Sequence, residues 1–199
     1  MKTLPNVLPP LEWFAALVAA QSGPESHYDG PSTAFLLEQQ KQLLEQEQRE
    51  HRLVRTISLG RVPWLYVAEL RTRSLGRTTS GEIVDVDRHV LAIRYLPDFL
   101  RRVNRWETLK YVAPLDPAPF HPNICPETGA VCLEVYPGQM ITQVLLNLHE
   151  LLRYRLRQTD ERDALNHEAC RYVRNHVFQP LDERPLFGRS LDIRLQRLE

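Results

Sequence analysis

The chain has 199 residues, of which 43% are hydrophobic, so it is long enough for one domain whose core needs no metal or disulfide staple. Its 25 basic and 25 acidic residues balance, without the basic excess that favours nucleic-acid or membrane partners, and we expect protein partners instead. No apolar run approaches the roughly 20 residues that a bilayer requires, and three cysteines without a C-x-x-C pair fit a reducing cytoplasm.

Residues 1–31 are rich in proline, glycine and serine around one short apolar segment, and we expect an extension without a fold of its own. Lys2 and the apolar stretch that follows Glu12 faintly resemble a secretion signal, but prolines interrupt the pattern. Trp13 and Phe14 are the side chains expected to dock this extension on the main domain.

A long helix is predicted from the Pro31-Ser32-Thr33 segment to about Arg52, because serine or threonine can cap its start. Its leucines recur every seven residues, at positions 36, 37, 43 and 44. Two repeats are too few to sustain a coiled coil, so we expect this helix to pack on a sheet.

Strands are predicted next, as an antiparallel meander of four. They cover residues 54–59, 64–70, 90–95 and 108–112. A turn is expected at residues 77–81, and residues 83–86 are expected to lengthen the third strand into a longer hairpin. Pro114, Pro117 and Pro119 lack a backbone N–H for a ladder, so they end the fourth strand.

Residues 121–140 show no clear period and are predicted to form an ordered loop, and loops of this length usually carry function. A central amphipathic helix follows from Ile141, because apolar residues recur at helical spacing. These residues are Val144, Leu145, Leu148, Leu151, Leu152 and Leu156. A further helix, capped by Asn166, is predicted to contain Ala169, Cys170, Val173 and Val177, with Cys170 in the core.

The predicted loop contains the segment Phe120-His121-Pro122-Asn123-Ile124, then a polar turn through Gly129, then Val131-Cys132-Leu133. This order resembles the active-site signature of ubiquitin-conjugating enzymes, in which a His-Pro-Asn turn precedes a cysteine between two aliphatic residues. The resemblance covers about residues 32–180 and is strongest from 120 to 178. We therefore expect a domain over 32–180, between the extension 1–31 and an Arg-rich tail at 181–199 that ends in a short helix.

The resemblance implies the α+β fold of that family. Its parts are an N-terminal helix, a four-stranded antiparallel meander, an active-site loop, a central helix and C-terminal helices. It also implies that Cys132 accepts a ubiquitin-like modifier from an activating enzyme as a thioester and passes it to an amine of a target protein. Sulfur suits this role because a thiolate is both a strong nucleophile and a good leaving group.

The resemblance gives the neighbouring residues supporting roles. Asn123 is expected to stabilise the negative charge that develops on the attacked carbonyl oxygen, or the loop around it. His121 and Pro122 organise the turn, and Asp163 positions or desolvates the attacking amine, with Asp160 and Glu161 as substitutes. ATP is used on the activating partner, so this chain is expected to need no metal or organic cofactor.

Alternatives remain at this point. The chain can be a noncatalytic binding or scaffold module of the same fold, although variants of that kind lack the cysteine. It can also be a hydrolase that pairs Cys132 with His121. Cys125 lies in the same loop, either as a redox partner of Cys132 or as an unpaired thiol. Zinc is not expected, because the spacing of the cysteines and His121 matches no common ligand pattern.

Several features depart from the family pattern. The segment Leu133–Met140 is short and lacks the family's Trp-Ser-Pro portion, Asn123 lies one residue further from the cysteine than is common, and the stretch Leu96–Phe99 lacks the usual Tyr-Pro continuation. The first helix is acidic where the family's helix is often basic. These departures favour a divergent branch, such as one in a bacterial ubiquitin-like conjugation operon with a role in antiphage defence.

Lysine is scarce: of the 25 basic residues, only Lys2, Lys41 and Lys110 are lysines. A GC-rich genome would produce this bias. A chemical reason would also produce it, since a thioester reacts with nearby amines whereas a guanidinium stays protonated and is a poor nucleophile. The second interpretation predicts slow self-modification of the chain.

Overall fold

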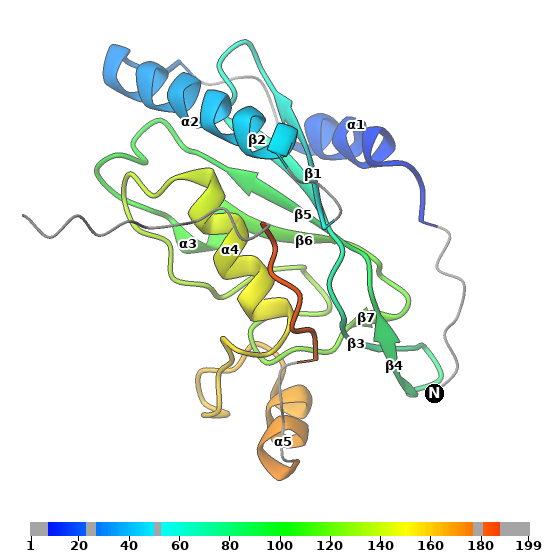
Figure 1. Ribbon diagram of the computed structural model, residues 1–199. Helices are drawn as coiled ribbons and strands as arrows, with labels where there is room; N and C mark the ends of the chain where they lie inside the picture. The colour runs from blue at the N-terminus through cyan, green and yellow to red at the C-terminus, as the bar shows by residue number, and fades with distance from the viewer. Residues whose placement is uncertain (1–7, 23–26, 50–52, 177–180, 188–199) are drawn as a thin grey trace, which may run out of the picture.

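The computed structural model of the chain describes residues 8–22, 27–49, 53–176 and 181–187. Its centre is a four-stranded antiparallel sheet in the order β1-β2-β5-β6 (Figure 1). The strands are β1 (Val54–Leu59), β2 (Leu65–Leu70), β5 (His89–Arg94) and β6 (Leu109–Ala113). The predicted meander is confirmed, and every strand begins and ends within one residue of its predicted position.

A second sheet has the order β4-β3-β7. It contains β3 (Ser74–Arg77), β4 (Ile83–Val86) and the short β7 (Ala118–Pro119). The predicted hairpin therefore forms, but residues 83–86 do not lengthen the third strand of the main sheet. Residues 83–86 pair with β3 instead, from Val86 opposite Ser74 to Ile83 opposite Arg77.

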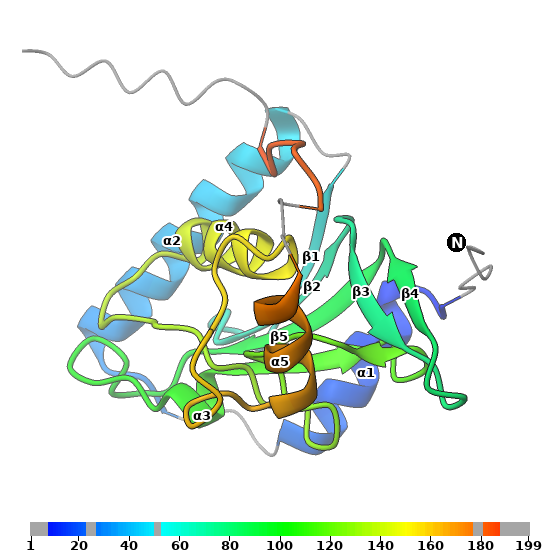
Figure 2. The same ribbon diagram turned by 90° about the horizontal axis from the view of Figure 1, so that it is seen from below.

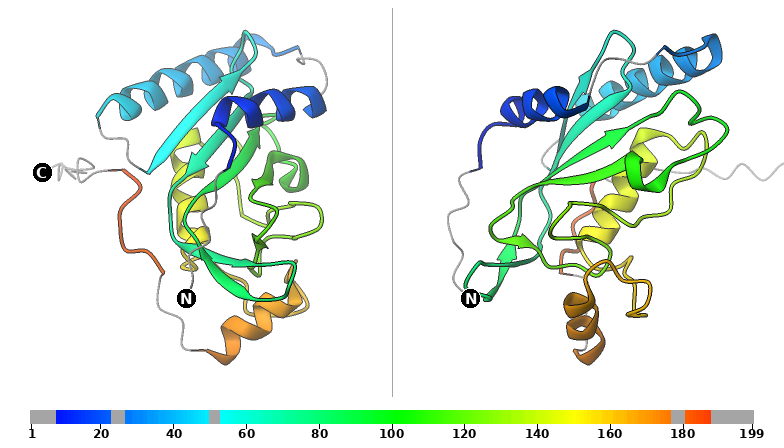
Figure 3. Two further views of the ribbon diagram at one scale, coloured as in Figure 1. Left: turned by 90° about the vertical axis from the view of Figure 1, so that its right-hand side faces the viewer. Right: turned by 180° about the vertical axis from the view of Figure 1, so that it is seen from behind.

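Helices cover both faces of the main sheet (Figures 2 and 3). The helices α2 (Gly30–Arg49) and α4 (Ile141–Leu152) lie on one face, and α1 (Leu11–Ser22) lies on the other. Every residue of β2 is buried as a result. The predicted long helix is confirmed by α2, whose Leu36 and Leu43 face the core while Leu37 and Leu44 are exposed.

Helix α1 was not predicted from the sequence. It buries a stripe at helical spacing, made of Leu11, Phe14, Ala15 and Val18, in the main core. Phe14 docks as expected, but Trp13 is 52% exposed because its position in the helix points away from that stripe. Arg88 fixes the start of α1 by donating to the carbonyl oxygens of Leu8 and Pro9 over 2.9 and 3.0 Å.

The central helix α4 is confirmed but ends at Leu152, earlier than predicted. Tyr154 takes a positive φ of 68°, which stops the helix, so Leu156 lies beyond it and is exposed. A single turn of helix, α3 (Arg105–Thr108), precedes β6.

Helix α5 (His167–Asn175) confirms the predicted cap, because the Asn166 side chain accepts the Ala169 N–H over 3.0 Å. Cys170 is fully buried, as expected. Val177 lies outside the described residues.

Residues 181–187 pack back onto the domain, and Leu186 and Phe187 join the main core. The buried Asp182 carboxylate accepts the backbone N–H of Arg73 over 3.0 Å. Burial alone would raise the pKa of Asp182, but hydrogen bonds from Arg184 and Arg73 hold it well below its usual range. The expected helix at the end of the tail lies outside the described residues. Within the described part of the chain, no helix has the length and apolarity to cross a membrane.

Candidate active site

Cys132 and Asn123 face each other across a small antiparallel ladder within the loop. The Cys132 N–H donates to the Asn123 carbonyl over 2.8 Å, and the Asn123 side-chain amide donates back to the Cys132 carbonyl over 2.9 Å. Ile124 and Val131 form the next rung. The backbone of the cysteine is thus held in both directions, and the turn between the two residues takes up their unusual separation in sequence.

The tip of this ladder is docked on the edge strand β6. Tyr111 of β6 donates its N–H to the Gly129 carbonyl over 2.7 Å. Gly129 has a φ of 72°, and a Cβ at this position would clash with the Tyr111 carbonyl oxygen. Only glycine therefore allows the loop to approach the sheet this closely.

The His-Pro-Asn turn also holds the segment that follows α4. The Asn123 side-chain oxygen accepts the Gln158 N–H over 2.7 Å, and the Pro122 carbonyl accepts the N–H of Leu165 over 2.8 Å. Asn123 is therefore a crosslink between the backbone of Cys132 and the loop that carries Asp163. Each fixed hydrogen bond of this kind contributes about 1 kcal/mol to stability.

His121 is buried and works as a structural residue in the turn. Its Nδ1 accepts the Asn123 N–H over 3.1 Å, and burial lowers the pKa of His121 to about 3. The ring therefore stays neutral at physiological pH. Such a weakly basic imidazole cannot activate Cys132, which counts against a Cys-His hydrolase.

Tyr154 supports this turn from beneath, and sequence reasoning missed it. Its hydroxyl donates to the Phe120 carbonyl, and its ring centroid lies 4.5 Å from that of His121. The residue belongs to a second core cluster with Leu75, Phe120 and residues of α5. The sequence signal is a tyrosine that directly follows the apolar run of the central helix.

The three acids named from the sequence differ in their availability. Asp160 is occupied by Arg162, whose hydrogen bonds lower the pKa of Asp160, and Glu161 pairs with Arg174 over 2.5 Å. Asp163 lies exposed at the end of the same turn, and no hydrogen bond or ion pair within the described ranges occupies its carboxylate. Asp163 is not among the residues that line the groove at Cys132, described next.

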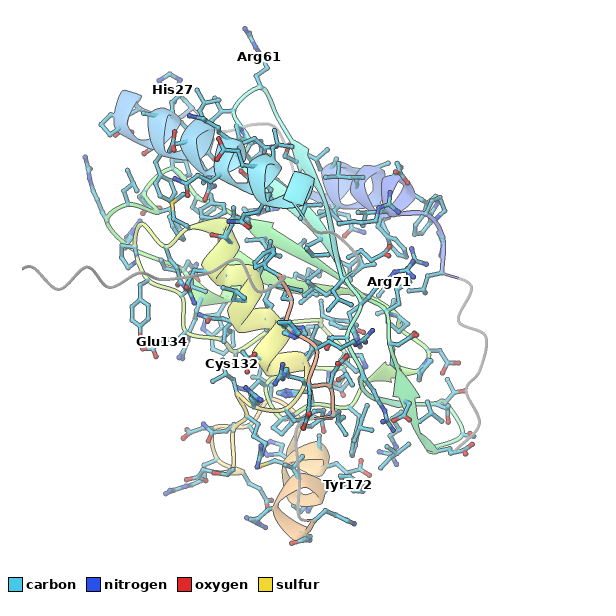
Figure 4. The ribbon with its side chains drawn as sticks, in the orientation of Figure 1. His27, Arg61, Arg71, Cys132, Glu134 and Tyr172 are labelled. Carbon is cyan, nitrogen blue, oxygen red and sulfur yellow. The ribbon has the colours of Figure 1, made fainter. Side chains whose placement is uncertain are left out.

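Cys132 is partly exposed, and Glu134 lies near it on the same segment (Figure 4). Both residues line a groove of about 800 Å³. The groove runs between the loop before β6 and the segment after the cysteine. Its apolar lining consists of Leu96, Val103, Leu133 and Val135. Its polar lining consists of Asp98, Arg102, Asn104, Arg105, Glu107 and Glu134. A polypeptide bound here would meet both apolar and charged side chains.

The other two thiols lie in different environments. Cys125 is partly exposed, and its sulfur donates to a Glu127 carboxylate oxygen over 3.1 Å. Cys170 is sealed in the core, where burial raises the pKa of its thiol. All three cysteines are free thiols. No group of histidine, cysteine and acidic residues among the described residues is arranged to hold a metal ion.

Three solved structures resemble this chain. A protein described as a novel ubiquitin-conjugating enzyme has 16% identity and a TM-score of 0.47 over 69% of this chain and 83% of its own. A putative ubiquitin-conjugating enzyme from Plasmodium yoelii has 24% identity and a TM-score of 0.48 over 71% and 84%. The E2 domain of a Toxoplasma gondii ubiquitin-conjugating enzyme has 22% identity and a TM-score of 0.45 over 68% and 83%.

The chain is similar in structure to ubiquitin-conjugating enzymes. No protein-family model and no curated protein sequence matches it. At this distance the likeness to ubiquitin-conjugating enzymes concerns the fold, and the chemistry of Cys132 has to be judged from this chain's own geometry.

Proposed function

We propose that this protein is a conjugating enzyme that accepts a ubiquitin-like modifier from an activating enzyme as a thioester on Cys132 and transfers it to an amine of a target protein. One observation carries the proposal: Cys132 opens into a groove while both its backbone N–H and its carbonyl are bonded to Asn123. The residue is partly exposed, and its backbone is held in place. Three free thiols suit a reducing compartment such as the cytoplasm.

In the loading step, the Cys132 thiolate attacks the thioester carbonyl carbon on the activating enzyme. The new C–S bond forms, the old one breaks, and the leaving thiolate takes up the proton that Cys132 gave up. The exchange needs no net energy because one thioester replaces another. The modifier therefore stays activated on Cys132.

In the transfer step, a target amine attacks the same carbonyl carbon, and negative charge develops on the carbonyl oxygen. Asn123 has one amide N–H engaged with the Cys132 carbonyl, which leaves its second N–H available for that oxygen or for the loop around it. The C–S bond then breaks, and the proton lost by the amine ends on the Cys132 thiol. Asp163 is the acid we assign to the amine, since Asp160 and Glu161 are occupied by arginines.

The proposal is tested by incubating the protein with its activating enzyme, the modifier and ATP, followed by nonreducing gels. We expect an adduct that a thiol reductant removes. It should be lost completely in Cys132→Ala and kept in Cys125→Ala and Cys170→Ala. An adduct on another cysteine would contradict the site, and tight modifier binding without any adduct would favour the noncatalytic module.

Removing the crosslink should separate the two steps. In Asn123→Ala we expect discharge of the loaded modifier to free lysine to slow by about 100-fold, the usual effect of losing a donor to a developing oxyanion, while loading changes far less. Discharge rates measured after the activating enzyme is quenched check this, with the exposed Asn175→Ala at the end of α5 as control. An unchanged discharge rate would remove Asn123 from the mechanism.

A further inference from the structure

Among the described residues, the charged lining of the Cys132 groove contains two guanidinium groups, beside three carboxylates, and no amine. Arg102 and Arg105 both line the groove, and none of its lining residues in the described part of the chain is a lysine. Lys110 lies on β6 and lines a different groove, beside α1. Lys41 lies on the exposed side of α2, and Lys2 is outside the described residues.

The two guanidinium groups are on long exposed side chains. Arg102 pairs with Asp98, and 84% of its side chain remains exposed. Arg105 lies over the exposed ring of Trp106, with 4.6 Å between its guanidinium carbon and the ring centroid. Neither contact encloses the side chain. A side chain of similar length that ended in an amine could therefore bring that amine into the groove that Cys132 lines.

An amine in that position would destroy the loaded form. Its lone pair would attack the thioester carbonyl carbon, a C–N bond would form as the C–S bond broke, and the amine proton would end on the Cys132 sulfur. The product is a stable amide on the enzyme itself, so that modifier can no longer be transferred to a target. A guanidinium stays protonated and delocalised, so it can donate hydrogen bonds to the carbonyls of a bound chain but cannot accept the acyl group.

We propose that Arg102 and Arg105 protect the thioester from self-transfer, because the basic side chains beside Cys132 are guanidinium groups, which cannot be acylated, and not amines. This inference rests on the proposed function, since it needs a thioester on Cys132. It makes the two arginines determinants of where the modifier goes. The modifier is kept for an amine brought by the target.

The test replaces each arginine by the amine that keeps its charge, in Arg102→Lys and Arg105→Lys. The control is Arg61→Lys, because Arg61 projects from the far end of the molecule from Cys132 (Figure 4). Each protein is loaded with modifier, and the activating enzyme is quenched. Conversion of the thioester to an adduct that resists reductant is then followed on gels. Peptide mass analysis locates the modified residue.

We expect at least one groove variant to convert to the self-adduct about tenfold faster than wild type, because an amine tethered beside the carbonyl has a high effective concentration. The adduct should map to the introduced lysine. Arg61→Lys, which introduces an amine away from the groove, should keep the thioester as long as wild type does.

Two results would overturn the inference. One is a thioester as long-lived in both groove lysine variants as in wild type. The other is rapid self-modification of wild type at Lys41 or Lys110. Both results require that wild type forms the thioester. Failure of the proposed function gives a different result, because wild type then forms no thiol-sensitive adduct. That result would overturn this inference as well.

Discussion

Replacing Cys132 by serine is expected to convert the modifier adduct from one that a thiol reductant removes into one that survives it. A serine hydroxyl at the same place would hold the modifier as an oxygen ester, which reacts with amines and thiols far more slowly than a thioester. The side chain is nearly the same size, and both backbone bonds to Asn123 use atoms that serine also has. The site should therefore keep its geometry while its leaving group worsens.

The measurement loads wild type and Cys132→Ser in parallel and treats the products with reductant or mild alkali. Wild type should lose its adduct in both, and the serine variant only in alkali. Discharge of the serine adduct to lysine should be slower by orders of magnitude. Cys125→Ser is the matched control and should behave as wild type. A reductant-sensitive adduct that persists in Cys132→Ser would show that another sulfur carries the modifier.

Acid is expected to destabilise the fold well above the pH at which carboxylates titrate, because histidines are buried in neutral form. His89 is fully enclosed, with one ring nitrogen 3.0 Å from the Thr72 carbonyl and the other 3.0 Å from the Tyr111 hydroxyl. A carbonyl only accepts, so Nε2 carries the proton and Nδ1 accepts from the tyrosine. Burial lowers the pKa of His89 to about 4 and that of His121 to about 3.

The direction of the effect follows from these pKa values. An unfolded histidine has a pKa of about 6.5, so between pH 6.5 and 4 these histidines bind protons in the unfolded chain but not in the folded chain. The stabilisation is complete above pH 6.5 and is lost as pH falls toward the folded pKa values. From pH 7 to pH 5 we expect each of the two histidines to remove on the order of 2 kcal/mol from the free energy of unfolding. Burial lowers the pKa of His149 too, in the same direction.

Urea denaturation at pH 7 and pH 5 checks this expectation. The difference between the two free energies of unfolding should shrink in His89→Gln, whatever the variant's stability at pH 7, and should be unchanged in the exposed His27→Gln. The pKa of Glu69 and that of Asp182 are lowered as well, but carboxylates titrate below about pH 4.5 and do not contribute to this window. Equal stability at the two pH values would contradict the buried neutral state.

The strands and the central helix were predictable from the sequence because their signals are local. Alternation of apolar residues and punctuation by Gly60 and Pro63 bounded β1 and β2 to within a residue. Helix α1 was missed because flanking prolines and glycines outweighed a short apolar segment. Its four buried side chains become informative only once a sheet face is there to receive them.

The candidate site shows the same division. Cys132, His121 and Asn123 were found because their order in the chain matches a motif. The sequence did not show how Asn123 and Cys132, nine residues apart, come together. In the structure their segments pair in a short antiparallel ladder that turns near Gly129. Tyr154 was missed because its role depends on a contact with Phe120, 34 positions away in the chain. The groove is likewise made by two distant segments.

The position of α1 has a practical consequence for anyone who shortens this protein. A piece beginning at residue 32 would match the domain limits expected from the sequence, yet it would lack α1 and leave the apolar face of the sheet beneath that helix exposed to water. Molecules with such a surface tend to stick together on storage. Helix α1 is therefore better kept, because it excludes water from one face of the sheet.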